Sequence, residues 1–321
     1  MTQSIVLLRD TAGLGRENPC RNRVAALKKK VTMKTTKKIY GIALALACGL
    51  AATLKGQVLY VANSGNNTIG EYGLDGSTVN ASLISGLSDP YGIAISGNDL
   101  FVANYGSSTV GEYTTSGGTV NAALISGLDR PFGIAISGNE LLVANAINGT
   151  IGEYTTSGAT NTSSLVTGLS DPDGIAISGN DLFITSGSGT VGEYTTSGAT
   201  INPSLISGLS EPFGIAISGN DLFVVNHGNG TIGEYTTSGA TVNPSLISGL
   251  DATGITISGN DLFVTYGASV GEYTTSGATV NASLIFGLAD PVGIAISVPE
   301  PSAGALAGLG AAAFWLWRRR K

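Results

Sequence analysis

PYGIAISGNDLFVAN, at residues 90–104, holds two short apolar segments on either side of the turn-forming residues Gly97, Asn98 and Asp99. Short apolar runs bounded by Gly, Asn and Asp indicate β-strands joined by a tight turn. Two further runs of this kind follow, at residues 109–113 and 123–128. The stretch from 90 to 128 therefore predicts four consecutive strands.

A unit of about 41 residues with this pattern occurs six times between residues 58 and 297. The motif Gly-Glu-Tyr marks every copy with a glutamate, at Glu71, Glu112, Glu153, Glu193, Glu234 and Glu272. A second motif, Gly-Ile-[Ala/Thr]-Ile, begins at Gly92, Gly133, Gly174, Gly214, Gly254 and Gly293. No window within the repeats has the apolar spacing of a helix, and a β-solenoid has a different period. The unit predicts an all-β, six-bladed β-propeller with four strands per blade.

The two ends of the repeat region are out of phase by one strand. The chain enters at residues 58–63, which match the second strand of a unit, and leaves after residues 291–297, which match the first strand. We therefore predict that the last blade is closed by N- and C-terminal strands, which leaves no open seam in the ring. Within the first strands, Ile alternates with Gly and Ala, so we expect the core to lie between closely packed blades.

Charge excludes several classes of partner for the repeat region. Residues 57–301 contain 20 Asp and Glu residues and one basic residue, Arg130, a net charge of about −19. Nucleic acid is excluded because its phosphates need Lys and Arg, and anionic lipids and phosphorylated ligands are disfavoured. Cations, neutral sugars and basic proteins remain, or the charge serves only solubility. Both cysteines, Cys20 and Cys48, precede the repeats, so we expect a domain without disulfides. We also expect a monomer.

The N-terminal segment predicts export. Residues 33–38 are rich in Lys and residues 39–54 are apolar, as in the helix of a secretory signal peptide, here 33–56. Residues 1–32 have no role ahead of such a signal, so we interpret 1–32 as an upstream extension and Met33 as the natural start. The residues before Cys48 faintly resemble a lipoprotein cleavage site, which leaves lipidation as an alternative.

The C-terminal segment, 298–321, has three parts: the motif Val298-Pro299-Glu300-Pro301, an apolar segment at 302–317 and a basic end at 318–321. This order resembles a PEP-CTERM sorting signal. The resemblance implies transient membrane insertion of a helix at 302–317, recognition by an exosortase-type transpeptidase, and transfer to the envelope, cell surface or extracellular matrix of a Gram-negative bacterium. Sixteen helical residues span only ~24 Å, less than a bilayer core of ~30 Å, which favours this interpretation over a permanent one-pass anchor.

The first two strands of the unit carry a further family pattern. This chain has PFGIAI at 131–136 and LFVAN at 100–104. These segments resemble the Pro-x-Gly-[Val/Ile]-Ala-[Val/Ile] and [Leu/Ile]-[Tyr/Phe]-Val-Ala-[Asp/Asn] strands of the NHL and gluconolactonase-like six-bladed propellers. The resemblance covers all six units and implies the fold, but the motif is structural and implies no activity. Lactonase-type relatives hold a metal at the channel mouth with Glu, Asn and Asp, a set that this sequence does not match residue by residue.

One face of the predicted propeller carries the variable positions of the repeat. The residue between Pro and Gly of the first strand reads Tyr91, Phe132, Asp173, Phe213, Thr253 and Val292. On the same face Asn63, Asn104, Asn145 and Asn226 end the second strand, and His227, the single histidine, follows the last of them. We predict a ligand-binding mouth formed by Tyr91, Phe132, Asp173, Phe213, Asn104, Asn145, Asn226 and His227. The two ends of the repeat region are predicted on the opposite face, so a C-terminal tether would leave this mouth free.

Acidic residues precede the first strand of every unit: Asp89, Asp129, Asp171, Glu211, Asp251 and Asp290. Because Ca²⁺ takes oxygen ligands, Asp89, Asp171, Glu211 and Asp290 are candidate metal ligands, and Ca²⁺ is the one cofactor that the sequence suggests. The alternative is that each of these residues only forms the turn before proline.

No catalytic residue is predicted. The chain has no Gly-x-Ser-x-Gly elbow, His-Glu-x-x-His helix or nucleotide-binding glycine loop in a suitable context. The glutamate of Gly-Glu-Tyr is the same in all six units, which indicates a role in the fold, since a catalytic acid and base need different environments. The sequence favours an exported, non-catalytic binding or scaffold module for a glycan, matrix protein or cation. A metal-dependent, lactonase-like hydrolase and a purely structural matrix protein are the alternatives.

Overall fold

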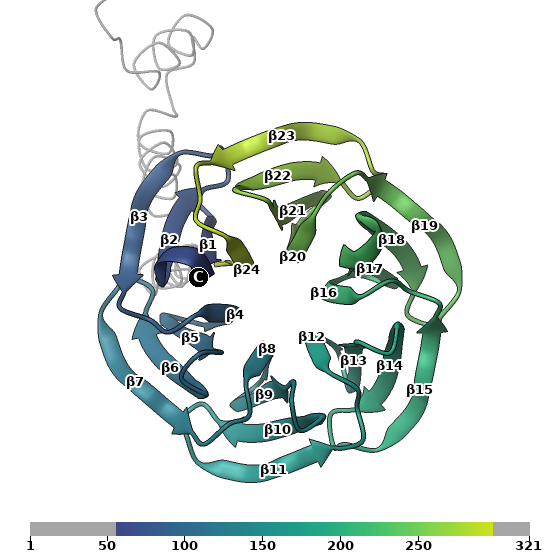
Figure 1. The fold of residues 1–321 in the computed structure, drawn as a ribbon, viewed down its shortest axis with the longest axis horizontal. Coiled ribbons are helices and arrows are strands. Elements are labelled where there is room, and N and C mark those ends of the chain that lie inside the picture. The colour runs from purple at the N-terminus through teal and green to yellow at the C-terminus, as the bar shows by residue number, and fades with distance from the viewer. Residues whose placement is uncertain (1–55, 298–321) are drawn as a thin grey trace, which may run out of the picture. The chain divides into compact units, whose positions relative to one another are not determined.

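Six four-stranded antiparallel sheets surround a central channel in the computed structural model (Figure 1). The structure describes residues 56–297. Within them, the prediction of an all-β, six-bladed propeller with four strands per blade is confirmed. The predicted upstream extension, signal-peptide helix and C-terminal membrane helix fall outside the described residues.

Each blade places its strands in the same order from the channel outward. The first, innermost strands are β4 (Pro90–Ser96), β8 (Pro131–Ser137), β12 (Pro172–Ser178), β16 (Pro212–Ser218), β20 (Ala252–Ser258) and β24 (Pro291–Ile296). The second strands are β1 (Val58–Asn63), β5 (Asp99–Asn104), β9 (Glu140–Asn145), β13 (Asp181–Ser186), β17 (Asp221–Asn226) and β21 (Asp261–Tyr266). The third strands are β2 (Thr68–Gly73), β6 (Thr109–Thr114), β10 (Thr150–Thr155), β14 (Thr190–Thr195), β18 (Thr231–Thr236) and β22 (Ser269–Thr274).

The fourth strands form the rim of the ring. They are β3 (Thr78–Ser85), β7 (Thr119–Ser126), β11 (Thr160–Val166), β15 (Thr200–Ser207), β19 (Thr241–Ser248) and β23 (Thr279–Phe286). Two short 3-10 helices, η1 (Ser64–Asn66) and η2 (His227–Asn229), connect a second strand to a third strand.

The rim strands begin earlier than the sequence predicts. The apolar run at 123–128 predicts the fourth strand of its unit, whereas β7 covers Thr119–Ser126. The first five residues of β7 are exposed. An outermost strand meets solvent, so it needs no apolar alternation there and gives no hydrophobic signal. The innermost β4 is bounded by contacts on both faces and has the predicted limits.

The ring closes as predicted. β24 pairs with β1, so one blade combines a C-terminal first strand with three N-terminal strands. The Ser297 amide donates a hydrogen bond to the Val58 carbonyl oxygen at 3.0 Å. Both ends of the described chain therefore lie at the end of β24 opposite Pro291, which begins β24 at the channel mouth.

The core lies between the blades. Six apolar clusters each combine side chains from two neighbouring blades. In one of them Phe101 and Val110 of one blade pack against Ile134, Leu141 and Val143 of the next. Burying a side chain of this size contributes about 1.5–3 kcal/mol, so contacts between blades hold the ring together, as the sequence predicts.

Close contacts explain why glycine recurs in both motifs of the unit. In Gly-Glu-Tyr, the Tyr113 ring folds over Gly111, where a Cβ would lie 2.7 Å from the ring. In the channel, Gly174 faces the carbonyl oxygen of Phe213 from the next blade, and a Cβ there would lie 2.5 Å from that oxygen. The other five units repeat this approach. Glycine therefore lets the six innermost strands converge, which brings the variable residues beside them together.

Candidate functional site

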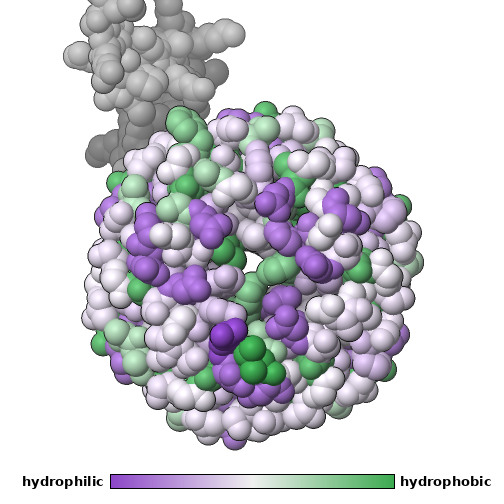
Figure 2. Space-filling view, in the orientation of Figure 1, coloured by the Kyte–Doolittle hydropathy of each residue, from purple (hydrophilic) through white to green (hydrophobic). Residues whose placement is uncertain are grey.

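The variable residues between Pro and Gly line one cavity at the mouth of the central channel. Its volume is about 140 Å³, and every blade contributes its innermost strand. The variable lining residues are Tyr91, Phe132, Asp173, Phe213, Thr253 and Val292. The space-filling view shows a central opening with hydrophilic residues around it (Figure 2). The structure thus gathers four of the predicted ligand-binding residues, Tyr91, Phe132, Asp173 and Phe213, into one site.

Aromatic rings form a continuous row on one side of this mouth. The ring centroids of Tyr91 and Phe132 are 4.5 Å apart in an edge-to-face arrangement. Those of Phe132 and Phe213 are 5.5 Å apart, and the His227 ring continues the row 4.9 Å from Phe213. The row therefore runs along this side of the mouth from β4 to η2 and offers aromatic surface that can stack on a planar ligand or attract a cation.

Tyr105 extends this row and is absent from the predicted site residues. Its ring stacks on Tyr91 with centroids 4.9 Å apart, and the Arg130 guanidinium lies 5.3 Å from the Tyr105 centroid. Nη1 of Arg130 also donates a hydrogen bond to the Tyr105 hydroxyl at 3.1 Å. Tyr105 follows Asn104 as His227 follows Asn226, and this position varies among the units. The same signal that singled out His227 was therefore available for Tyr105.

Asp173 is the one acidic residue that lines the cavity, and it is only 7% exposed. It lies on β12, which packs between β8 and β16, and the Phe132 and Phe213 rings on those strands contact each other. No hydrogen bond or ion pair from residues 56–297 reaches its carboxylate. Burial, with a smaller contribution from the charge of Asp171, raises the pKa of Asp173 to about 8. An unpartnered carboxyl group with such a pKa, facing a cavity, is a candidate functional group.

The electrostatic potential around the mouth is negative. Burial raises the pKa of Tyr91 to about 12, with contributions from Asp89, Tyr105, Asp290 and Asp173. Burial and the charge of Asp290 also raise the pKa of Asp89. The carboxylates of Asp89, Asp290 and Asp173 therefore all act on the Tyr91 side chain, and the mouth disfavours anionic ligands.

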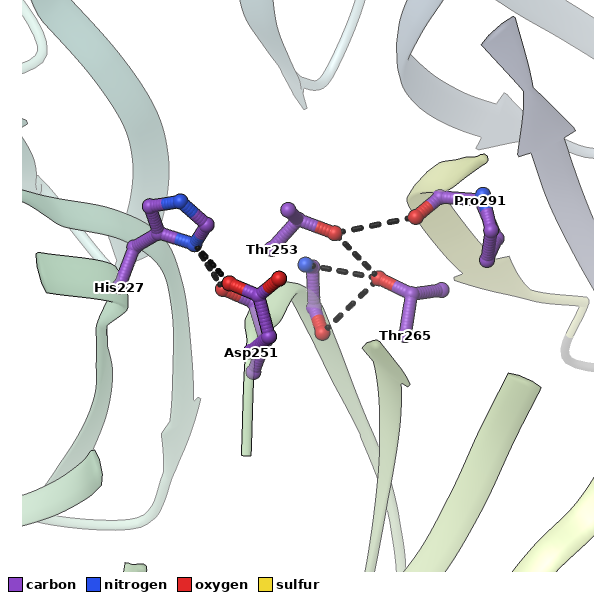
Figure 3. A network of polar contacts seen from close by, with 7 residues as sticks. His227, Asp251, Thr253, Thr265 and Pro291 are labelled. Carbon is purple, nitrogen blue, oxygen red and sulfur yellow. Dashed lines mark hydrogen bonds and ion pairs between the residues drawn. The ribbon is translucent and has the colours of Figure 1, made fainter. Parts of the chain in front are cut away.

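His227 belongs to a polar network at the edge of the mouth (Figure 3). Its Nδ1 lies 3.3 Å from the Asp251 carboxylate and 3.0 Å from the Ala252 carbonyl oxygen. On the other side of the network, the Thr253 hydroxyl donates a hydrogen bond to the Pro291 carbonyl oxygen at 3.0 Å. The network holds in place the segment that leads into β20, and it orients the His227 ring toward Phe213.

Two buried threonines position the mouth and are also absent from the predicted residues. Thr185 accepts a hydrogen bond from the Gly174 amide and donates one to the Phe213 carbonyl oxygen, each at 2.6 Å. Thr265 makes the equivalent contacts with the Gly254 amide and the Val292 carbonyl oxygen. Each threonine ties the innermost strand of its blade to that of the next. Other units have Ala or Val at this position, so the change to threonine could have identified these two residues from the sequence.

The predicted asparagines do not line the cavity. Asn104, Asn145 and Asn226 are 2–3% exposed. Burial raises the pKa of Tyr113 on the neighbouring strand β6, and a hydrogen bond from the Asn104 amide lowers it. Asn145 and Asn226 have the same relation to the tyrosines of their own blades. These amides therefore support the third strand, and their proposed contact with a ligand has no direct geometric support.

The predicted metal ligands occupy turns around the mouth. Asp89, Asp171, Glu211 and Asp290 all have positive φ angles, between 46° and 51°. Each comes directly before proline, so the alternative role in the turn fits this geometry; Arg130 takes the same conformation in another blade. Within residues 56–297 no three His, Cys, Asp or Glu side chains lie close enough to share an ion. Ca²⁺ binding stays a prediction.

A family model for the PEP-CTERM protein-sorting motif matches residues 297–321. Such a signal indicates export through the envelope of a Gram-negative bacterium and recognition by an exosortase. Its motif includes the predicted residues Val298, Pro299, Glu300 and Pro301. No curated protein matches the chain in sequence. Among residues 56–297, no helix has the length and apolar character needed to cross a membrane.

Solved structures share the fold of residues 56–297. A chain in a crystal structure of a nidogen/laminin complex is 18% identical, with a TM-score of 0.63; the match covers 76% of this chain and all of that chain. A catalytically inactive histidine-to-alanine variant of virginiamycin B lyase from Staphylococcus aureus, with quinupristin, is 22% identical, with a TM-score of 0.58. That match covers 76% of this chain and 89% of the lyase. A streptogramin B lyase is 21% identical, with a TM-score of 0.56 and coverage of 75% and 92%. Identities this low establish the propeller fold alone.

Proposed function

We propose that this protein is an exported, surface- or matrix-attached propeller that binds a ligand at its channel mouth without catalysing a reaction. The supporting observation is the contrast between the uniform repeats and their one irregular region. The six units share their turns and inter-blade contacts, yet the cavity-lining positions carry three aromatic residues, one unpartnered carboxyl group, a threonine and a valine. Such asymmetry in a repeat protein favours a ligand that approaches the mouth from one side.

The sorting tail supports a location outside the cell membrane. The PEP-CTERM match begins at residue 297, directly after β24, and β24 ends on the face opposite the mouth. A protein attached through this end would keep its mouth available to glycans, matrix proteins or cations around the cell. Processing by an exosortase-type transpeptidase would follow transient membrane insertion of 302–317.

Binding at the mouth is tested with a double variant, Phe132→Ala with Phe213→Ala, and with polysaccharide and protein fractions of the extracellular matrix from the producing culture. We expect the double variant to bind at least tenfold more weakly than the wild type, because stacking and burial on aromatic rings contribute about 1–3 kcal/mol. Val120→Ala with Val242→Ala, on the exposed rim strands β7 and β19, is the control. Equal binding by the two double variants would contradict the role of the mouth, and no binding by any form would favour a structural matrix protein.

A second candidate is a metal-dependent hydrolase or lyase. It is favoured by the contact of His227 Nδ1 with Asp251 and the Ala252 carbonyl oxygen, which leaves the other ring nitrogen available at the edge of the mouth. Two of the similar solved structures are lyases, which suggests a class of activity to test but assigns no role to any residue. Turnover of a lactone, or of quinupristin, by the wild type with a divalent cation, lost in His227→Ala, would support this candidate over binding alone.

A further inference from the structure

We propose that the cavity at the channel mouth binds a quaternary alkylammonium head group, held against Asp173 by the faces of Tyr91, Phe132 and Phe213. This inference rests on the proposed function, since it names the chemical class of the ligand for the same site. It depends on four observations: the charge of the lining, its rings, its few hydrogen-bond acceptors and its size.

The charge of the lining selects a cation. Asp173 is the single carboxylic acid among the lining residues, it is only 7% exposed, and no positive group within residues 56–297 contacts it. Arg130, the one basic residue of residues 56–297, is placed on Tyr105 outside the cavity lining. A cation in the cavity would pair with the carboxylate and offset the cost of ionising it in this environment.

The rings favour an organic cation over a metal ion. Tyr91, Phe132 and Phe213 all line the cavity, and their centroids are 4.5–5.5 Å from those of their neighbours in the row. Several ring faces around one cation attract it through their quadrupoles, and they replace the water that a weakly hydrated organic cation gives up easily. The row already holds one cation in this way, because the Arg130 guanidinium lies over Tyr105.

The small number of free side-chain acceptors favours a methylated nitrogen over a primary ammonium group. A primary ammonium carries three N–H donors, and each would need an acceptor in the cavity. Besides Asp173, the polar side chains among the lining residues are Tyr91, which offers one hydroxyl, and Thr253, whose hydroxyl already bonds to the Pro291 carbonyl oxygen and contacts Thr265. A quaternary ammonium has no N–H group, and its methyl groups can pack against the isoleucines and glycines of the wall.

The volume limits the ligand to a head group. A cavity of about 140 Å³ is smaller than the roughly 300–1,000 Å³ of sites that enclose a drug-sized molecule. The cavity therefore suits one compact charged group, with the rest of the ligand outside in the opening that Figure 2 shows.

The direct test is calorimetric titration of the purified full chain at about pH 9 with choline, with methylammonium, and with the neutral isostere of choline in which carbon replaces the charged nitrogen. The titratable neighbours of Asp173 are Asp171, before β12, and Tyr91, across the mouth, while β8 and β16 present Phe132 and Phe213. Tyr91 stays protonated at this pH. We expect choline to bind at least about tenfold more tightly than either of the other two compounds.

Matched variants separate the local charge from the general field. Asp173→Asn should weaken choline binding by about tenfold or more, and Phe132→Leu by several-fold, because leucine keeps apolar volume without a ring face. Asp171→Asn removes the same charge from an exposed position two residues away and should stay within about twofold of the wild type.

Three results would overturn the proposal: no saturable binding of choline, isostere binding as tight as choline binding, or full affinity in Asp173→Asn. If choline fails while the matrix fractions still bind and lose affinity in the Phe132 and Phe213 double variant, the binding function stands and only the ligand class is wrong. A positive result is extended with phosphatidylcholine vesicles. Recruitment to vesicles would identify a lipid head group, and binding of free choline alone would identify a solute or a matrix substituent.

Discussion

Replacing Asp173 by asparagine should stabilise the propeller at alkaline pH. Asp173→Asn keeps the shape of the protonated side chain and removes its negative charge. Burial raises the pKa of Asp173 from 3.8 to about 8 in the folded protein. Because the folded state binds this proton more tightly than the unfolded state, the associated stability is complete below about pH 4 and is lost as the pH rises to about 8.

The size of the effect follows from the shift in pKa. About four pKa units correspond to at most about 5–6 kcal/mol, at ~1.36 kcal/mol per unit. We expect a smaller value, on the order of 2–4 kcal/mol, because water in the cavity and small movements of the Phe132 and Phe213 rings reduce the cost of ionisation. A ligand that neutralises Asp173 would reduce the difference further, so the measurement is made without added cations.

Urea unfolding of the full chain at about pH 5, pH 7 and pH 9 measures this effect. The free energy of unfolding of Asp173→Asn relative to wild type should increase across the series, and most of the increase should fall below pH 8. Asp171→Asn is the matched control, since that residue is exposed and asparagine tolerates its φ of 48°. Parallel pH profiles for wild type and Asp173→Asn would refute the interpretation of Asp173 as a buried, unpartnered carboxyl group.

Three further predictions concern the packing of the mouth and the fate of the tail. Gly133→Ala should lower the free energy of unfolding by about 2 kcal/mol or more, because its Cβ would press on the Asp173 carbonyl oxygen, whereas Gly118→Ala, which reproduces the residue found in four other units, should be neutral or stabilising in the same urea titration. Thr265→Val should cost about 1–3 kcal/mol in thermal unfolding, because valine leaves the Gly254 amide and the Val292 carbonyl oxygen without this partner; an unchanged midpoint would show that other groups replace it. Deleting residues 298–321 should abolish exosortase processing without impairing the fold. Cell fractionation measures the location of the protein, and intact mass measures its processing. Wild-type protein that reaches the cell surface with its mass unchanged by processing would contradict the role of the tail.

The repeats made the fold predictable, and the reason is physical. Six copies of one pattern average out the ambiguity of any single apolar run. The three strands left over at the N-terminus and the single strand left over at the C-terminus imply closure by β24 and β1. The starting positions of the rim strands were not predictable, since β7 begins with exposed residues that give no apolar alternation. The cavity at the channel mouth was predictable too, because variation between Pro and Gly singles out Tyr91, Phe132, Asp173 and Phe213, which line it, within otherwise constant strands.

The sequence by itself determined the architecture, the sorting tail and the side of the ring on which the variable residues lie, because period, spacing and strand direction are local properties of the chain. The tertiary structure decided which of those residues form a site. Tyr91 and Phe132 are 41 residues apart in sequence and Phe132 and Phe213 are 81 apart, and their rings meet because glycines let the innermost strands converge. The burial and raised pKa of Asp173 arise from neighbours on the adjoining blades, and the burial of Asn104 beside Tyr113 removes it from the cavity. Desolvation depends on everything packed around a group, so no local pattern in the sequence could report it.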